Sequence, residues 1–576
     1  MDLNRRIFGT RRTGFSEHIV SRFSLTERVI FYICAITITI SSIVLLWGVN
    51  NNFLVPVPAR GGTLVEGIVG YPRFINPILY YSSAGDDLEK LIYSGLVKSM
   101  PDGTLVPDLA KSYDISEDEL TYTFVLKDNV KFHDGEPVTA EDVEFTIKRA
   151  ADPGIKSPER VKWEGVNVEI VDPKTIRFTL KNPYTPFLEN ATLGILPKHI
   201  WKNADIEQFT FSKFNAEPIG TGPYFIDIIK RDVEGIPRYY ELRSFKDYAL
   251  GEPMIEKIVV KFYPTETAVI EAYNKGEVES INAVSGKNVA DFASVNGEVN
   301  KTPLPRVFGV FLNQNQQKIL SNKEVREALR MSVNKKEIID TVLHGYGTRI
   351  AGPLPPGFPL VTDDDEDRAE ADIDGARELL SSNGWTLDEN GFFEKKSKTD
   401  STALKFTIST SDTPELSATA NLLKEQWRKI GADVDVKVFE SGDFNQSVLR
   451  PRKYDALLFG EIIGRDLDLY AFWHSGERND PGLNIAMYAN TSVDKALSSI
   501  RSTSLADERA EQLLIIQKEI KEDIPAIFIY SPDYIYVLPK KIKNFKMGKL
   551  MGPSERFASV SDWYINEDKV WNIFAK

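Results

Sequence analysis

Cysteine and histidine are scarce in this sequence, which has one cysteine and five histidines among 576 residues. The single cysteine, Cys34, has no partner for an internal disulfide. The histidines form no HExxH pair and no cysteine–histidine cluster, so we expect no metal site. A GxSxG nucleophile motif and a phosphate-binding loop are also missing. Acidic residues are plentiful, but no catalytic pair stands out among them, so we expect no catalytic residue and no cofactor.

Basic residues are outnumbered, because 70 Lys and Arg stand against 83 Asp and Glu, a formal net charge of −13. Proteins that bind nucleic acid need a basic surface, so nucleic acid is not an expected partner. The chain is also too long for one ordinary domain and predicts several.

One long segment has no charge at all. Residues 29–49 read VIFYICAITITISSIVLLWGV, and as a helix they would reach about 30 Å, one hydrocarbon thickness. Six arginines precede this segment, whereas the first basic residue after it is Arg60. The positive-inside rule then predicts a single-pass cell-membrane protein with its N-terminus in the cytoplasm and the bulk of the chain extracytoplasmic. The arginines are Arg5, Arg6, Arg11, Arg12, Arg22 and Arg28.

The predicted order at the N-terminus is therefore a basic cytoplasmic arm over 1–28, a transmembrane signal-anchor helix in the lipid bilayer over 29–49, and a linker over 50–60. The prolines of the linker predict a stiff spacer before the folded part. Val57-Pro58-Ala59 weakly resembles a signal-cleavage site, so removal of the anchor stays an alternative.

Strand and helix patterns alternate along the exported part, which predicts α/β lobes. β-branched and aromatic runs predict strands at 121–126, 175–180, 257–262 and 405–409. Apolar periodicity predicts helices at 139–151, 265–275, 323–343, 374–382, 414–430 and 505–522. Thr139 and Asp142 are placed as a capping box for the first helix. Gly345 and Gly431 are placed as helix stops.

Several motifs follow one another at characteristic spacing. From Val106 the chain reads VPDLAKSYDISEDELTYTFVLKDNVKFHDGEPVTAEDVEFTIKRA, and PIGTGPYF follows at 218–225. Further blocks are NKEVREALRMSVNKKEIIDTVLHG at 322–345, DGARELLSSNGW at 374–385 and DIPAIFIY at 523–530. These blocks resemble the family-5 extracellular solute-binding proteins, the oligopeptide- and dipeptide-binding components of ABC importers. Within them, His133 and the glycines of GTGPY read as scaffold, since glycine permits a tight backbone path that a side chain would block.

The resemblance implies a two-lobed, periplasmic-binding-protein-like α/β fold with a hinge, preceded by one transmembrane helix. Lobe I would span 61–308, with an inserted subdomain at about 97–215, lobe II would span 309–534, and residues 535–576 would return to lobe I. It also implies a peptide or peptide-like ligand, held largely through its backbone in a closing cleft. The implied protein partners are the transmembrane permease subunits of an ABC transporter with their ATPase subunits.

Residues 457–475 read LLFGEIIGRDLDLYAFWHS. The corresponding run in the family is approximately G-W-x-A-D-Y-x-D-P, and this chain departs from it. In the peptide binders that it resembles, the Trp lines the cleft and the first Asp pairs with the peptide ammonium. Here Gly460 matches, whereas Glu461 stands at the Trp position and Gly464 at the Asp position. Glu461 or Asp466 could supply the missing carboxylate and Arg465 could bind a carboxylate or phosphate. Alternatively, the ligand has no free N-terminus, or these charges face solvent.

Six aromatic residues complete the candidate ligand-binding set: Tyr80, Tyr81, Trp473, Tyr488, Tyr530 and Tyr534. For the first four, core packing is favoured over ligand contact, and the last two lie near the expected hinge strand. The predicted function is an extracytoplasmic substrate-binding receptor of an ABC transporter that captures peptides for import. The alternatives are a membrane-tethered peptide sensor or chaperone without transport, and a tethered hydrolase.

Overall fold

The computed structural model describes residues 23–79, 82–292, 297–358, 371–396, 401–503 and 505–575. These residues form two compact units. The first unit contains the described residues up to Ala59 together with those from Asn566 onward, and the second unit is Arg60–Ile565.

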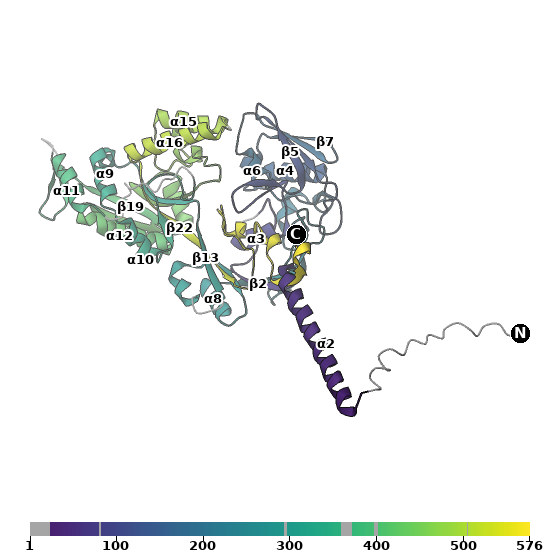
Figure 1. Cartoon of the computed structure of the whole chain (residues 1–576). Helices are drawn as coiled ribbons and strands as arrows, with labels where there is room; N and C mark the ends of the chain where they lie inside the picture. The colour runs from purple at the N-terminus through teal and green to yellow at the C-terminus, as the bar shows by residue number, and fades with distance from the viewer. Residues whose placement is uncertain are drawn as a thin grey trace. The chain divides into compact units, whose positions relative to one another are not determined.

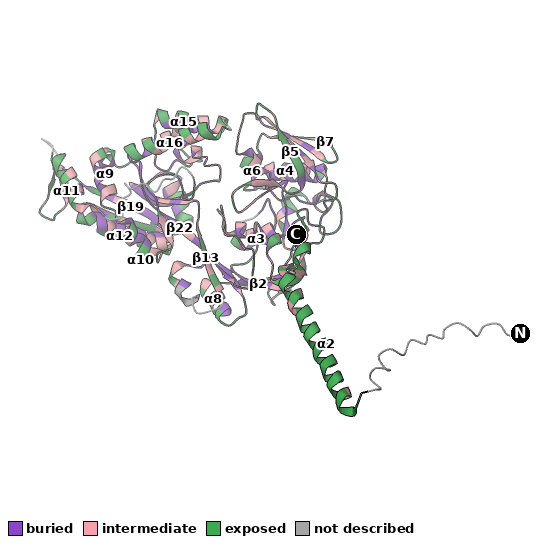
Figure 2. Ribbon diagram, in the orientation of Figure 1, coloured by how far each residue is buried: buried purple, intermediate pink, exposed green. Residues whose placement is uncertain are grey.

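The first unit is dominated by one long helix, α2 (Leu25–Phe53), which Figures 1 and 2 show as a rod exposed along its length. The helix starts with a capping box, in which a carboxylate oxygen of Glu27 accepts the backbone N–H of Ser24 at 2.8 Å. It has no buried residue and is long and apolar enough to cross a membrane. Its apolar part agrees with the predicted membrane segment 29–49.

The expected spacer at 50–60 has to be corrected. Helix α2 continues to Phe53 and passes directly into strand β1 (Leu54–Ala59). This strand pairs antiparallel with β23 (Asn566–Trp571). Of the segment 535–576 that was expected to return to lobe I, the residues from Asn566 onward therefore belong to the first unit, whereas those up to Ile565 belong to the second. Pro56 and Pro58 are tolerated because a two-stranded sheet leaves one edge of β1 unpaired.

The second unit is organised around one sheet of twelve strands. The strand β22 (Ala526–Pro539) is the longest and lies at its centre. In order along the sheet the strands are β20 (Asp433–Phe439), β19 (Lys405–Ser411), β21 (Ala456–Ile462), β14 (Arg306–Leu312), β22, β12 (Ser280–Asn282), β2 (Thr63–Val69), β11 (Lys257–Tyr263), β10 (Pro237–Ser244) and β9 (Tyr224–Arg231), with β13 (Gly297–Pro303) and β15 (Gly347–Arg349) also paired to β22.

Smaller sheets and helices complete the two lobes. Lobe I carries a separate four-stranded sheet in the order β5 (Ala110–Ile115), β6 (Thr121–Leu126), β8 (Thr175–Thr179) and β7 (Asn167–Asp172), a strand pair β3 (Val97–Ser99) and β4 (Leu105–Pro107), and the helices α3 (Ser83–Ile92), α4 (Ala140–Ala151), α5 (Arg160–Trp163), α6 (Phe187–Asn190), α7 (Lys198–Trp201) and α8 (Glu266–Asn274). Lobe II carries the sheet β16 (Trp385–Leu387), β17 (Phe393–Lys396) and β18 (Ser401–Ala403), and the helices α9 (Lys323–Met331), α10 (Lys335–Val342), α11 (Ile373–Ser382), α12 (Pro414–Lys429), α13 (Ser441–Asp443), α14 (Tyr470–Trp473), α15 (Thr491–Ser502) and α16 (Ala506–Asp523). The result is the mixed α/β fold that the sequence predicts.

Two antiparallel segments join the lobes. The first half of β22 pairs with β14 as far as Tyr530, and its second half pairs with β13 from Asp533. Between these pairings the Ser531 hydroxyl donates to the carbonyl oxygen of Leu304 at 2.6 Å, and the Leu304 N–H donates to the carbonyl oxygen of Pro532 at 3.0 Å. The crossing segments are therefore bonded to each other, as in a two-stranded hinge. The lobe boundaries expected after residues 308 and 534 stay a prediction.

The helix predictions are confirmed except for one. A single helix was expected at 323–343, but the structure has α9 and α10 with a break between them. Asn334 causes the break, because its side chain accepts the N–H of Glu337 at 2.9 Å and caps a new helix there. Gly431 directly follows the C-cap of α12 with φ of 83°, as expected of a glycine stop. After α10 the left-handed backbone begins at His344, with φ of 53°, and continues through Gly345, with φ of 83°.

The VKFHDG and GTGPY motifs lie side by side in lobe I. The N–H of His133 donates to the carbonyl oxygen of Gly220 at 2.9 Å, and its ring Nε2 lies 3.1 Å from the carbonyl oxygen of Gly222. Burial lowers the pKa of His133 to about 4, so the ring is neutral at physiological pH. A Cβ on Gly220 would collide with the backbone of Ile92. Both motifs act as scaffold, as predicted.

Candidate functional site

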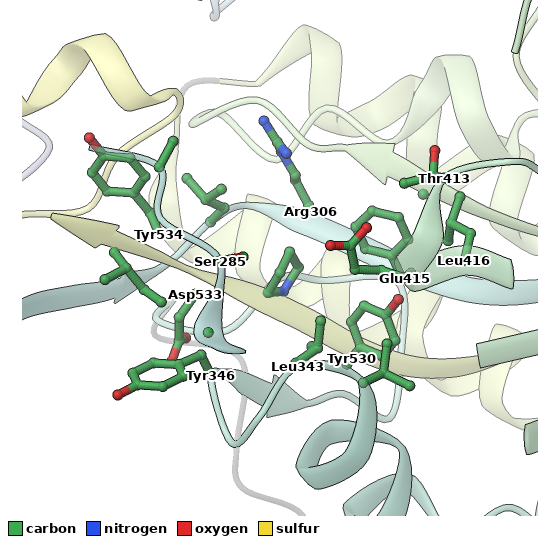
Figure 3. A pocket seen from close by; sticks show the side chains of 18 of the residues that line it. Ser285, Arg306, Leu343, Tyr346, Thr413, Glu415, Leu416, Tyr530, Asp533 and Tyr534 are labelled. Carbon is green, nitrogen blue, oxygen red and sulfur yellow. The ribbon is translucent and has the colours of Figure 1, made fainter. Parts of the chain in front are cut away.

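A cleft of about 890 Å³ lies where the lobes meet. Its lining comes from the hinge strand β22, from the paired strands β14 and β21, from the start of α12 and from lobe I residues near Ser285 and Pro553. The volume is within the roughly 300–1,000 Å³ that ligand pockets occupy. In Figure 3, Tyr530, Asp533 and Tyr534 follow one another along the hinge strand, so the cleft is built directly on the hinge.

Aromatic packing forms one wall of the cleft. The rings of Phe308 and Tyr530 stack at a centroid distance of 5.2 Å with an interplanar angle of 25°. Opposite Phe308 on β21 stands Gly460, where a Cβ would come within 2.6 Å of the phenyl ring. The predicted site residue Gly460 therefore lines the cleft by leaving room for this ring. Burial raises the pKa of Tyr530 to about 12, so its hydroxyl stays protonated.

Arg306 is a cation in the cleft without an anionic partner among the described residues. It begins strand β14 just after the hinge crossing and is partly buried. Figure 3 shows its side chain between Tyr534 and Glu415 in that view. Burial lowers the pKa of its guanidinium, although the group remains charged. A partly desolvated arginine of this kind suits a ligand carboxylate.

Glu461 is an acidic side chain that lines the same cleft. Its side chain is 3% exposed and lines the cleft, and neither carboxylate oxygen has a hydrogen-bond partner among the described residues. Burial raises the pKa of Glu461 well above its ordinary value, and the nearby indole of Trp473 lowers it only in part. A buried carboxyl group without partners is rare in proteins, because it forfeits its hydrogen bonds to water. A donor or cation supplied by a ligand would satisfy it.

Acidic groups outnumber fixed cations around the cleft. The carboxylates are those of Glu266, Glu415, Glu461 and Asp533, and the cations are Arg306 and Lys287. Burial also raises the pKa of Asp533. Among the described residues, no group of three or more His, Cys, Asp or Glu side chains is arranged to hold a metal ion. Asp533 pairs with Lys301 at 3.5 Å, so the acidic groups left to a ligand are chiefly Glu415 and Glu461, which suit a ligand with N–H donors.

Comparison with known proteins identifies the class of receptor. The model of the bacterial extracellular solute-binding proteins, family 5 Middle, matches residues 104–481, more than half of the chain. The chain belongs to this family.

Two curated relatives and a solved structure illustrate the family's range. The oligopeptide-binding protein AppA of Bacillus subtilis is 27% identical over 517 residues, which cover 88% of this chain and 92% of the relative. The nickel-binding periplasmic protein of Escherichia coli is 30% identical over 465 residues, covering 78% and 80%. The structure of Bacillus subtilis AppA with a nonapeptide has a TM-score of 0.69 at 26% identity and covers 88% of this chain and 100% of that one. The chain is thus a solute-binding receptor with the family-5 fold.

Arg465 and Asp466, predicted at this receptor's ligand site, do not line the cleft. The Arg465 guanidinium lies between two acidic residues, with Nη2 2.8 Å from Glu555 and Nε 3.4 Å from Glu189. Glu189 and Glu555 belong to lobe I, so Arg465 forms an ion pair between the lobes. The backbone carbonyl oxygen of Asp466 accepts a hydrogen bond from Arg509 at 2.6 Å. Neither residue is proposed as a ligand contact here.

Trp473 and Tyr488 are also placed elsewhere. Both are buried in a hydrophobic core of lobe II, where their rings lie 6.2 Å apart. The Tyr488 hydroxyl donates to a carboxylate oxygen of Asp523 at 2.6 Å, which satisfies it inside the protein. Core packing therefore accounts for both. Tyr80 and Tyr81 lie outside the described residues.

Tyr530 and Tyr534 remain at the cleft, together with residues that sequence reasoning missed. Tyr534 is 2% exposed, and its hydroxyl has no hydrogen-bond partner among the described residues. Arg306, Phe308 and Asp533 were not predicted. Arg306 could have been found from its position directly before the apolar run VFGVFL at a lobe boundary. A charged side chain at the start of a buried strand needs water or a ligand beside it, because the apolar core cannot solvate it.

Proposed function

We propose that this receptor is a membrane-tethered, extracytoplasmic component of an ABC importer and that it captures peptides or peptide-like solutes. The observation that carries the proposal is the hinge cleft lined by Arg306, which has no ion pair among the described residues, and by the buried Glu461, whose carboxylate oxygens have no hydrogen-bond partner among them. A peptide offers the two complementary groups, a terminal carboxylate and a terminal ammonium. The transporter subunits and the retention of α2 as an anchor are parts of the same proposal.

The positions of the two charges favour an extended ligand. In the register of β14 with β21, Arg306 lies opposite Ile462 and Val307 lies opposite Glu461. Side chains alternate between the faces of a sheet, so Arg306 and Glu461 leave the strands on opposite faces. One molecule can reach both only by passing over the end of these strands, which an extended peptide can do.

The test is binding to the purified full-length chain in detergent. Peptides that co-purify are identified by mass spectrometry, and candidate peptides are screened by thermal unfolding, because ligand at 100 times its Kd adds about 2.7 kcal/mol of stability. Glu461→Gln and Arg306→Gln should each weaken a bound peptide at least tenfold, since each leaves a desolvated ligand charge unpaired. Glu234→Gln and Arg238→Gln, on an exposed hairpin of lobe I, are the matched controls.

N-acetylated versions of the same peptides separate the two contacts. If Glu461 meets the ammonium, acetylation should weaken binding to the natural protein and have little further effect on the Glu461→Gln variant. If no peptide raises the unfolding temperature while another class of solute does, the peptide assignment is wrong. Uptake of a labelled peptide by cells with and without the gene distinguishes import from a sensor or chaperone role, and intact peptide after prolonged incubation argues against a hydrolase.

A further inference from the structure

The C-terminal segment exposes apolar side chains that solute binding does not use. Trp571, Ile573 and Phe574 are 47%, 75% and 72% exposed, and Phe53 at the end of α2 is 57% exposed. Large apolar side chains that gather on a surface mark a contact with another protein or with a membrane.

The pairing of β23 with β1 brings these residues to the end of helix α2. Trp571 lies opposite Leu54, the first residue after the helix, whereas Asn566 lies opposite Ala59 at the far end. The indole N–H of Trp571 donates to the side-chain oxygen of Asn50 at 2.8 Å, and its ring lies 6.4 Å from that of Phe53. The end of the C-terminal strand is thus bonded to the last turn of the helix.

Charge along the C-terminal strand changes with distance from the helix. Glu567, Asp568 and Lys569 are exposed and lie opposite Pro58, Val57 and Pro56, away from the helix. From residue 570 to residue 575 the chain has no charged side chain. The strand is therefore polar where it is remote from α2 and apolar where it reaches α2.

The depth of this apolar end follows from the helix. The uncharged run ends at Val49, and Phe53 comes four residues later, which is about 6 Å further along the axis. A headgroup layer is about 5–7 Å thick on each side of the hydrocarbon. With α2 across a bilayer, Phe53 and its neighbour Trp571 fall in the layer where aromatic residues are enriched.

We propose that Phe53, Trp571, Ile573 and Phe574 form a membrane-interface collar, a second contact with the outer headgroup layer of the lipid bilayer beside α2. The inference rests on the proposed retention of α2 as a membrane anchor. The collar also gives that retention a structural reason, because cleavage after Ala59 would remove β1 and leave β23 without its partner strand. The occupant is lipid and not protein, since the apolar end is continuous with the membrane-spanning helix.

The experiment places a probe on the collar of the full-length chain in vesicles of phosphatidylcholine and phosphatidylglycerol. In a Cys34→Ser background, Phe574→Cys is labelled with an environment-sensitive fluorophore, and Val233→Cys, on a fully exposed turn of lobe I, is the matched control. The label at 574 should emit at shorter wavelength than the label at 233. It should also be quenched by lipids that carry a spin label near the headgroup, and less by lipids with a deep spin label. Both cysteines replace exposed side chains, so folding is not at stake.

Three outcomes would overturn the collar. Emission and quenching at 574 equal to those at 233 would mean that the segment stays in water. A shift in emission without quenching by lipid would mean that protein covers the segment. Alkaline carbonate extraction of the same vesicles is the third readout. Release of the chain would overturn the anchor and the collar together, whereas a retained chain with a water-exposed label at 574 would overturn the collar alone.

Discussion

Replacing Arg556 by methionine should be one of the most destabilising single substitutions in lobe I. The guanidinium is completely buried and donates to both carboxylate oxygens of Asp87, at 2.5 and 2.8 Å, and to Glu66 at 3.0 Å. Glu66 and Asp87 are buried as well, with exposures of 0% and 2%. Ser83 and Pro553, which flank this triad in sequence, line the ligand cleft, so the triad supports the lobe I side of the site.

The magnitude follows from what methionine leaves behind. Two buried carboxylates lose their cation, and removing one partner of a buried ion pair costs about 3–5 kcal/mol. Glu66 keeps hydrogen bonds from the hydroxyls of Ser280 and Tyr536 and from the Asn282 amide, which favours the lower end of that range. Burial raises the pKa of Asp87, although the positive charge of Arg556 lowers it in part. Loss of that charge will raise the pKa further. The folded variant then binds protons more tightly than its unfolded chain, so the deficit should shrink as the pH falls from about 8 to about 5.

Urea unfolding followed by tryptophan fluorescence at both pH values measures the effect. Arg243→Met, which breaks an exposed pair with Asp227 in the same lobe, is the matched control and should leave the midpoint unchanged, because exposed ion pairs contribute little. If Arg556→Met shifts the midpoint no more than Arg243→Met at pH 8, the buried triad does not stabilise lobe I and the reasoning is refuted.

Further predictions concern the hinge and the cleft. Burial raises the pKa of Glu189 to about 7 where it faces Arg465 of lobe II, so this arrangement of the lobes should take up a proton there as the pH falls. Closure, followed by small-angle X-ray scattering, should increase as the pH falls from about 8 to about 5, and Glu189→Gln should abolish that part of the dependence. Gly460→Ala should cost about 1–3 kcal/mol in urea unfolding and weaken ligand binding, because the new methyl displaces Phe308; unchanged affinity would count against this wall. Ser531→Ala removes one buried hinge hydrogen bond and should cost about 1 kcal/mol, with a loss above 3 kcal/mol contradicting the simple bond-loss account.

Features encoded locally were predictable from the sequence. Three such features depend only on residues close together in the sequence, and the structure agrees with them: the apolar run of α2, the Thr139–Asp142 capping box and the glycine stop at Gly431. The break between α9 and α10 is also encoded locally, by the side-chain cap at Asn334. The apolar periodicity continues across this residue, and for that reason the sequence predicted one continuous helix. The resemblance of several spaced motifs to one family then predicted the fold, and one of these motifs marks the tight backbone path around Gly220.

The ligand site was harder to predict because tertiary pairing assembles it. Gly460 keeps the family pattern and Glu461 departs from it, and both residues line the cleft. Arg306 reaches the same cleft only through the pairing of β14 with β21. Trp473 was drawn into the candidate set by being aromatic and near the motif, but an indole of its size is most easily accommodated in a core. The pairing of β1 with β23 joins opposite ends of the chain, and no local pattern signals it.

The segment that carries Glu461 also links binding to closure. Glu461 lines the cleft, and Arg465, four residues later, forms ion pairs with Glu189 and Glu555 of lobe I. A ligand held by Glu461 would therefore contact strand β21, which leads directly into the segment that pairs with lobe I through Arg465. By linkage, if a bound ligand multiplies the equilibrium constant for closure by some factor, the closed form binds that ligand more tightly than the open form by the same factor. Arg465 can thus govern affinity without touching the ligand, because it adjusts how much of the receptor is closed before the ligand arrives.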